Sequence, residues 1–146
     1  MEKQISMARQ ELETVEAQRL QLARLRRNVE YLQSKCTGTT ARYDLKTKTS
    51  PQQHSGLWDE LADCRQALEE QKQQLRDREA QLEQWIDMLP KPRWRMVLRC
   101  RYLDGMELSD VARELEEATG RDISMHQVYR LHSAALRAAD QMWPLS

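Results

Sequence analysis

The chain has 146 residues, of which 32% are charged and 5% aromatic, and 23 acidic residues balance 23 Lys and Arg. This length suits one domain or a small domain with an extension, and the scarcity of aromatic residues, Gly and Pro favours long exposed helices over sheets or a thick core. Net charge zero excludes a general attraction to nucleic acid, no apolar run approaches the ~20 residues that span a membrane, and three widely spaced cysteines predict a reducing cytoplasm rather than a disulfide framework.

The first predicted helix covers residues 1–36, which contain no Pro or Gly. Apolar residues recur there at alternating spacings of three and four, as in a coiled-coil seam. A gap at Gln18 and Arg19 divides the seam and predicts a change of register or a local break. The seam residues are Ile5, Ala8, Leu12, Val15, Leu22, Leu25, Val29, Leu32 and Cys36.

Residues 37–56 differ in composition from the helix before them. They are rich in Thr, Ser, Lys and Gly and include a Pro, which together disfavour regular structure. We predict a linker without a motif of its own. Its lysines, Lys46 and Lys48, are expected to be solvated rather than bound to phosphate.

The second long helix is predicted over residues 57–89. Its seam keeps a 4-3-4-3 spacing without a slip, which is typical of a coiled coil. Gln71 and Arg78 are polar members of this seam, and either an exposed seam tolerates them or they fix register and partner choice. The seam residues are Leu57, Leu61, Cys64, Leu68, Gln71, Leu75, Arg78, Leu82, Trp85 and Leu89.

Residues 1–89 are therefore predicted to form an oligomerisation arm. Two helices of similar length joined by a linker over 37–56 favour an antiparallel hairpin. A single hairpin has a thin core, so we expect a homodimer with a four-helix arm. A parallel dimer through 57–89 alone is the alternative.

Pro90 and Pro92 end the second helix, because Pro lacks the backbone donor and clashes with the preceding turn. Residues 90–146 then form three short amphipathic segments: a helix over 93–103, a second opened by Glu107 or Ser109, and a third capped by Ser124. Asp104-Gly105 and residues 119–122 separate them. The inward residues are expected to be Val97, Leu98, Tyr102, Leu108, Val111, Ala112, Leu115, Val128, Leu131, Ala135 and Leu136, with Met142 or Trp143 as an extension.

This segment resembles a known family. LPKPRWRMVLRCRYLDG, which begins at Leu89, is similar to the first helix and turn of sigma factor region 4, and LSDVAREL, from Leu108, is similar to its supporting helix. The spacing of apolar residues after Ser124 resembles that of the recognition helix. The resemblance implies an all-α fold in which the helical arm precedes a helix-turn-helix that reads double-stranded DNA. Small phage-encoded transcription regulators of Gram-positive bacteria, including activators of late genes, are similar in organisation.

Two departures from the family pattern bear on this expectation. Residues 116–123 make the connection between supporting and recognition helices longer than the family's short turn. The part of a sigma factor that melts promoters is absent, so the resemblance raises RNA polymerase as a partner without implying a complete sigma factor.

The resemblance also implies which residues meet DNA. Residues early in a recognition helix and off its apolar stripe reach base edges. Gln127 suits a bidentate contact with adenine, and Arg130 suits guanine or phosphate. The DNA-facing residues would be Met125, His126, Gln127, Tyr129, Arg130 and Ser133, and the phosphate contacts would be Arg93, Arg95, Arg99 and Arg121.

No motif points to an enzyme, a cofactor or a metal site. His126 and His132 are six residues apart on the last helix, which is a poor spacing for a metal pair, and both are expected at the surface or facing DNA. We therefore expect a cytoplasmic DNA-binding transcription regulator of a phage or mobile element. The alternatives are a DNA-packaging protein such as a small terminase subunit, and a protein-interaction module whose helix-turn-helix no longer binds DNA.

Overall fold

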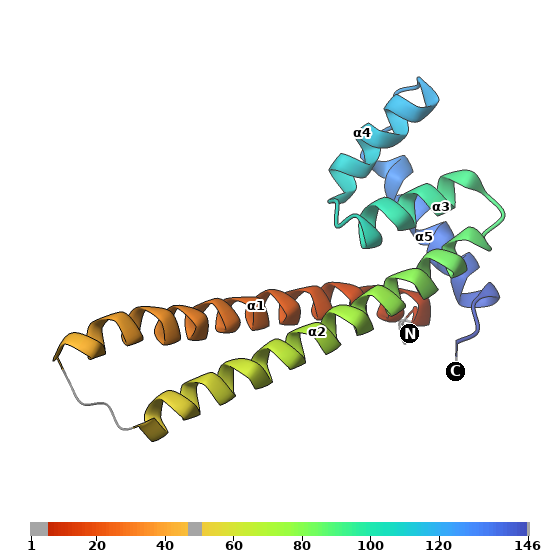
Figure 1. Ribbon diagram of the computed structural model, residues 1–146. Helices are drawn as coiled ribbons and strands as arrows, with labels where there is room; N and C mark the ends of the chain where they lie inside the picture. The colour runs from red at the N-terminus through yellow and green to blue at the C-terminus, as the bar shows by residue number, and fades with distance from the viewer. Residues whose placement is uncertain (1–5, 47–50, 146) are drawn as a thin grey trace, which may run out of the picture. The chain divides into compact units, whose positions relative to one another are not determined.

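The computed structural model describes the backbone of residues 6–46 and 51–145, and the side chains of 6–37 and 56–145. The predicted all-α fold is confirmed: every regular element within these residues is helical. Two long helices, α1 (Met7–Lys46) and α2 (Pro51–Asp87), form a hairpin and precede three shorter ones (Figure 1). None of the described helices is both long enough and apolar enough to cross a membrane.

The helices extend further into residues 37–56 than the predicted linker allows. α1 continues to Lys46 and α2 begins at Pro51, while residues 47–50 lie outside the described part of the chain. Thr37 illustrates why weak helix formers are tolerated here, because its hydroxyl donates to the Gln33 carbonyl one turn earlier at 2.8 Å. Proline is likewise compatible with a first helical turn, where its missing N–H would have no partner.

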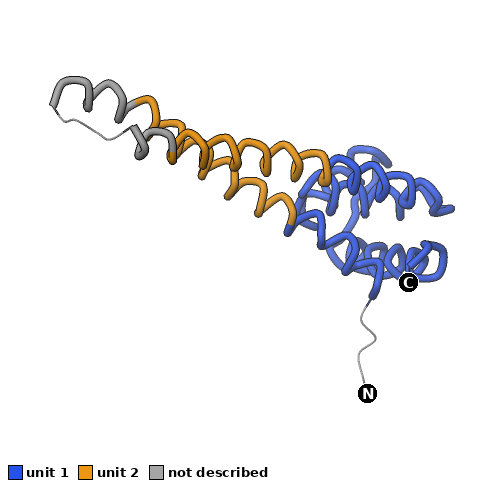
Figure 2. Tube along the Cα trace, turned by 60° about the horizontal axis from the view of Figure 1, so that its bottom comes forward, with its two compact units in different colours: residues 1–17, 76–146 blue, residues 18–75 orange. Residues whose placement is uncertain are grey.

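The chain divides into two compact units (Figure 2). One contains Gln18–Leu75, and the other contains Met1–Ala17 and Arg76–Ser146. The second unit therefore includes, besides residues 90–146, the first turns of α1 and the last turns of α2. We call Gln18–Leu75 the hairpin unit, and Met1–Ala17 together with Arg76–Ser146 the helical unit.

The hairpin unit buries the predicted seam. Leu22, Val29, Leu32 and Cys36 of α1 are buried, and Leu25 is half-buried. On α2, successive seam residues alternate between two degrees of burial: Leu61, Leu68 and Leu75 are buried, whereas Leu57, Cys64 and Gln71 are half-buried. The strict heptad spacing thus holds the two helices together along one narrow stripe.

The seam continues where α1 and α2 enter the helical unit. Ala8, Leu12 and Val15 are fully buried there, as are Leu82 and Leu89 of the predicted α2 seam, while Ile5 lies outside the described residues. Arg78 pairs with Glu11 of α1 and donates to Gln81, so this polar seam member links the two helices. Ile86, which the heptad pattern omits, is fully buried as well.

The C-terminal helices of this unit follow the predicted order. α2 ends at Asp87, and α3 spans Pro92–Leu98 with Pro92 in its first turn. Residues 99–103, expected to continue as α-helix, form a π-helical turn, Arg99–Leu103. α4 covers Leu108–Thr119 and α5 covers Met125–Met142.

α3 and α4 both pack against α5. Their shared core contains Val97, Cys100, Val111, Ala112, Leu115 and Val128, with Ile123 and Leu131 packed at its edge. The predicted extension of the α5 stripe is made by Trp143 and not by Met142, which is 42% exposed. Trp143 lies against Trp85 with ring centroids 5.5 Å apart, and its indole N–H donates to the Trp85 carbonyl at 2.9 Å.

Candidate nucleic-acid interface

The start of α5 is fixed by local hydrogen bonds. The Ser124 hydroxyl accepts from the Gln127 amide at 3.2 Å, and the Gln127 side-chain oxygen accepts from the Ser124 amide at 2.9 Å. This reciprocal capping box satisfies two backbone donors and confirms Ser124 as the N-cap. The first turn of α5, which carries the predicted base-contacting residues, is therefore held in place by its own sequence.

The connection between α4 and α5 is shorter than the sequence indicated. α4 continues through Glu116 to Thr119, so that only residues 120–124 separate the two helices. Gly120 ends α4 with a φ of 68°, a left-handed conformation that other residues adopt at a cost. The Glu116 carboxylate then accepts from the Ile123 amide at 3.1 Å and closes the turn.

All six predicted DNA-facing residues of α5 are exposed. They lie off the buried stripe formed by Val128, Ala135 and Leu136, as the apolar spacing predicted. Two are large and apolar or aromatic, Met125 (36% exposed) and Tyr129 (52% exposed). Gln127 is exposed, but its side-chain oxygen already accepts a hydrogen bond from the Ser124 amide. The predicted bidentate contact with adenine would require the same oxygen.

A cleft of about 300 Å³ lies beside the start of α5. Three arginines from separate elements line it: Arg93 of α3, Arg121 of the α4–α5 connection and Arg130 of α5. Gln127 lines it too, and Asp122 is its acidic member. Three guanidinium groups against one carboxylate give the cleft a positive charge, and guanidinium groups match phosphate oxygens in bidentate geometry.

The other two predicted phosphate contacts have structural partners. Arg95 donates to the Leu89 carbonyl at 2.6 Å, close to the end of α2. Arg99 pairs with Asp87 at 2.5 Å and with Glu83 at 3.7 Å. Of the four arginines, the structure thus brings Arg93 and Arg121 together with Arg130, and engages Arg95 and Arg99 in joining α2 to the helices that follow.

Residues that line the cleft but were missed by sequence reasoning come from the α4–α5 connection and its neighbours. They are Thr119, Asp122, Ile123 and Leu131. Gly120 marks two of them, Asp122 and Ile123, because it ends α4 in a left-handed conformation and they follow it in the connection.

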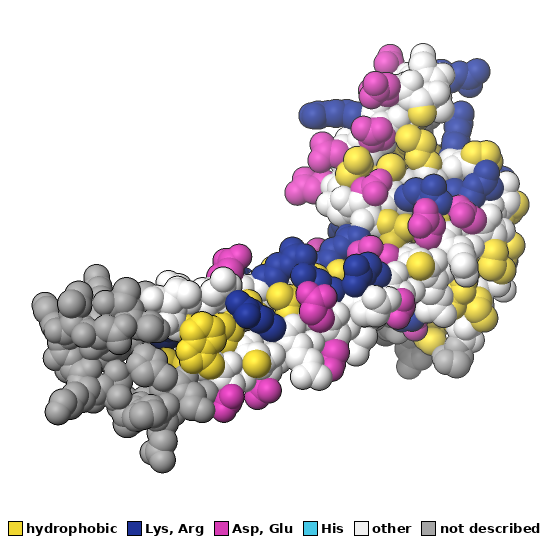
Figure 3. Space-filling view, in the orientation of Figure 1, with side chains coloured by type: hydrophobic (Ala, Val, Ile, Leu, Met, Phe, Trp, Pro, Cys, Tyr) yellow, Lys and Arg dark blue, Asp and Glu magenta, His cyan; other side chains and the backbone are white. Residues whose placement is uncertain are grey.

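The surface of α4 carries the opposite charge. Asp110 and Glu117 are exposed on this helix, and Glu114 is half-exposed, away from its buried residues Val111 and Leu115. Figure 3 shows Asp and Glu side chains gathered along α4. A negative α4 and a positive cleft make the helical unit electrostatically two-sided.

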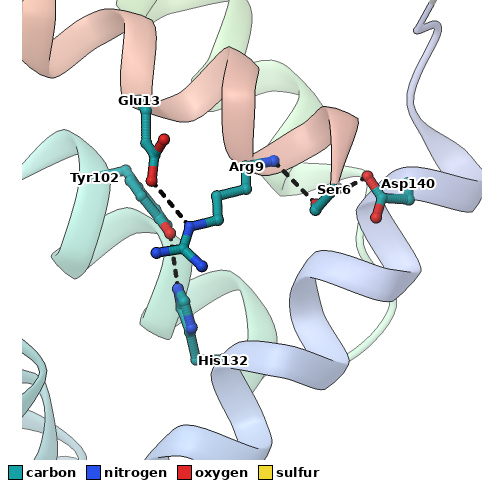
Figure 4. Close-up of polar contacts among 6 residues, drawn as sticks. All are labelled: Ser6, Arg9, Glu13, Tyr102, His132 and Asp140. Carbon is teal, nitrogen blue, oxygen red and sulfur yellow. Dashed lines mark hydrogen bonds and ion pairs between the residues drawn. The ribbon is translucent and has the colours of Figure 1, made fainter. Parts of the chain in front are cut away.

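His132 departs from its prediction as a surface or DNA-facing residue. It is half-buried, and its Nε2 lies 2.7 Å from the Tyr102 hydroxyl with the two rings stacked (Figure 4). Burial lowers its pKa to about 4, and the nearby charges of Arg9 and Arg101 act in the same direction. The side chain lies on the face of α5 that meets α1, which the α5 pattern alone does not reveal.

The same side of α5 holds the beginning of α1. The Asp140 carboxylate accepts from the Ala8 amide at 2.7 Å and from the Ser6 hydroxyl at 3.0 Å (Figure 4). A carboxylate is favoured at the positive end of a helix. Arg9 forms an ion pair with Glu13 at 2.9 Å, and its charge acts on both Tyr102 and His132. The contacts of His132 and Asp140 hold α5 against the start of α1 and against Tyr102, whereas the first turn of α5 stays exposed.

Among the described residues, no three His, Cys, Asp or Glu side chains lie close enough to hold a metal ion. Comparison of the chain with protein-family models, with curated proteins and with solved structures gives no match.

Proposed function

We propose that this protein is a sequence-specific regulator of transcription that binds double-stranded DNA and is encoded by a phage or mobile element. The observation that carries the proposal is the convergence of Arg93, Arg121 and Arg130 on one cleft beside the exposed start of α5. Phosphate contacts from such a cleft would set the position of α5, and residues of its first turns would then meet base edges in the major groove.

The division of charge supports this orientation. DNA carries a dense negative charge, so it would be repelled by the acidic surface of α4 and attracted to the arginine cleft. The chain needs no overall positive charge for this, because the attraction depends on where the charges lie. The resemblance to sigma factor region 4 fits the same arrangement of a supporting helix and a recognition helix.

The proposed partners follow from this function. The protein would act in the cytoplasm of its bacterial host as a homodimer, which brings two copies of α5 to one duplex. RNA polymerase is a second proposed partner that depends on the sigma-like resemblance alone.

Arg130→Ala tests the proposal, because it removes one guanidinium group from the cleft without changing a buried side chain. We expect binding to specific duplex DNA to weaken by ~1–3 kcal/mol, which is a rise in Kd of about fivefold to 150-fold. Fluorescence anisotropy at several salt concentrations measures the loss. The matched control is Arg137→Ala, an exposed arginine two turns further along α5 that does not line the cleft.

The control should bind DNA as the wild type does. Equal weakening by both substitutions would show a general effect of charge and contradict the cleft as the site. If Arg130→Ala bound DNA as tightly as the wild type, the proposal that α5 is the recognition helix would be wrong.

A further inference from the structure

The hairpin unit carries opposite charges on its two helices. Residues 18–37 of α1 contain five basic residues and one acidic residue, whereas residues 56–75 of α2 contain five acidic and two basic residues. Figure 3 shows Lys and Arg side chains gathered along α1. This separation is hidden in the composition of the whole chain, which has net charge zero.

The basic charge lies on the side of α1 that faces away from α2. Leu20, Arg24, Arg27 and Tyr31 follow one another at spacings of four, three and four, and therefore share one side of the helix. The seam residues Leu22, Val29 and Leu32 are buried on the opposite side. We call this stripe, with Lys35 at its end, the α1 outer face.

This face is exposed and contains large apolar side chains. Leu20 is 68% exposed and Tyr31 is 60% exposed, with the Lys35 ammonium 5.0 Å from the Tyr31 ring centre. Arg24 and Arg27 are exposed and pair with no acidic residue in the described part of the chain. Arginine and tyrosine are enriched where proteins meet one another.

α2 presents a complementary stripe. Asp59, Asp63, Gln66 and Glu70 recur at spacings of four, three and four on the side of α2 away from its seam, and all four are exposed. We call this stripe the α2 outer face. Trp58, next to it, is 46% exposed. At 1.5 Å per residue, the distance from Leu20 to Tyr31 along α1 equals that from Asp59 to Glu70 along α2, about 16 Å.

Within one chain these faces cannot neutralise each other. Packed helices are separated by about 8–10 Å between axes, and the two stripes point away from the shared seam in opposite directions. We propose that the α1 outer face of one chain docks against the α2 outer face of a second copy. The homodimer of the proposed function would thus be held by arginine–carboxylate pairs around the exposed apolar residues. DNA binding is not required for this association.

The second copy is favoured over nucleic acid as the occupant because the chain itself supplies the matching acidic stripe. A phosphate backbone would account for the arginines but not for an acidic face of the same length and spacing. The contact is heterologous, because it joins two different faces, and each copy brings one face of each kind to the association.

Arg27→Glu and Arg26→Glu in the full-length chain test the proposal. Both residues are exposed on α1, yet Arg26 is turned by about 100° around the helix and lies off the outer face. Sedimentation equilibrium without DNA should show reversible self-association of the wild type, with a dissociation constant that rises with salt. Arg27→Glu should raise that constant at least about tenfold, and Arg26→Glu should change it little.

Reversing the charges of both outer faces, in two separate variants, should rescue the association when the variants are mixed. Arg24→Glu/Arg27→Glu and Asp63→Lys/Glu70→Lys should each dimerise poorly alone, and mixing them should restore a mixed dimer. Circular dichroism checks that both variants keep their helices.

Three results would overturn the proposal. One is a wild-type chain that stays monomeric at high micromolar concentration. Another is equal dimerisation of Arg27→Glu and Arg26→Glu. The third is an Arg27→Glu chain that dimerises normally but loses affinity for non-specific duplex DNA, which would assign the α1 outer face to phosphate. Because the dimer is measured without DNA, its failure is distinct from a failure of the proposed DNA binding.

Discussion

The arginines show how residues of one type acquire different roles from their surroundings. Arg93, Arg95, Arg99 and Arg121 were equivalent candidates for phosphate contact in the sequence. Arg95 and Arg99 face the end of α2, where a backbone carbonyl and the Asp87 carboxylate accept their hydrogen bonds. Arg93 and Arg121 line the cleft with Arg130. Partners more than five residues away in the chain decide this division, so a local pattern could not reveal it.

His132 carries a pH dependence that follows from the same kind of burial. Its pKa is lowered to about 4 in the folded chain, compared with 6.5 for an ordinary histidine. Between these values the unfolded chain binds a proton that the folded chain does not, so acidification favours unfolding. We expect the wild type to lose about 2 kcal/mol of stability from this group between pH 7 and pH 4, after allowance for partial exposure.

Urea unfolding of wild type and His132→Gln across this pH range measures the effect. Glutamine does not titrate and can still accept from the Tyr102 hydroxyl, so carboxylate titration common to both proteins cancels in the difference. The wild type should become less stable relative to the variant as the pH falls below 6.5. Parallel pH profiles would show that His132 is not held neutral by the fold.

At the scale of elements, the heptad spacing predicted both long helices and most of their buried residues. The Pro90 and Pro92 boundary and the Ser124 cap were also predicted, because proline and capping chemistry act within a few residues. The extension of α1 to Lys46 and the burial of Ile86 were missed. The burial of Ile86 depends on what α2 packs against, which the heptad pattern of one helix does not contain. Likewise, the exposed face of α5 was predicted, but the cleft beside it was not, since α3 contributes Arg93 from elsewhere in the chain.

Two glycines provide a matched test of helix geometry. Gly120 has a φ of 68°, whereas Gly56 lies inside α2, and an added Cβ would meet nothing within 4 Å at either position. A substitution to alanine therefore differs between the two positions only in the backbone strain that it causes. Gly120→Ala should destabilise the protein by about 1 kcal/mol, and Gly56→Ala should stabilise α2 by about 0.5–1 kcal/mol.

Thermal unfolding followed by circular dichroism measures both glycine variants under the same conditions. Opposite signs are expected. A stabilising effect of Gly120→Ala would contradict the left-handed end of α4 and, with it, the turn that places Arg121 in the cleft.

At the scale of the whole molecule, the two compact units carry separate tasks in the proposed account. The hairpin unit would bind a second copy through its two charged faces, and the helical unit, which holds the arginine cleft, would use α5 as a recognition helix. Joining two weak DNA contacts in one dimer raises affinity through effective concentration, without any new contact to DNA. Net charge zero is compatible with the proposed DNA binding, because each proposed interaction is local.

The central claim is that α5 and the arginine cleft read DNA sequence. Selection of bound duplexes from a random pool, with the full-length chain as bait, tests it most directly. We predict that the wild type and Arg137→Ala enrich the same sequence motif, with two half-sites if the dimer binds, and that Arg121→Ala/Arg130→Ala does not enrich it. Recovery of no common motif by the wild type, or of the same motif by the double variant, would contradict the account.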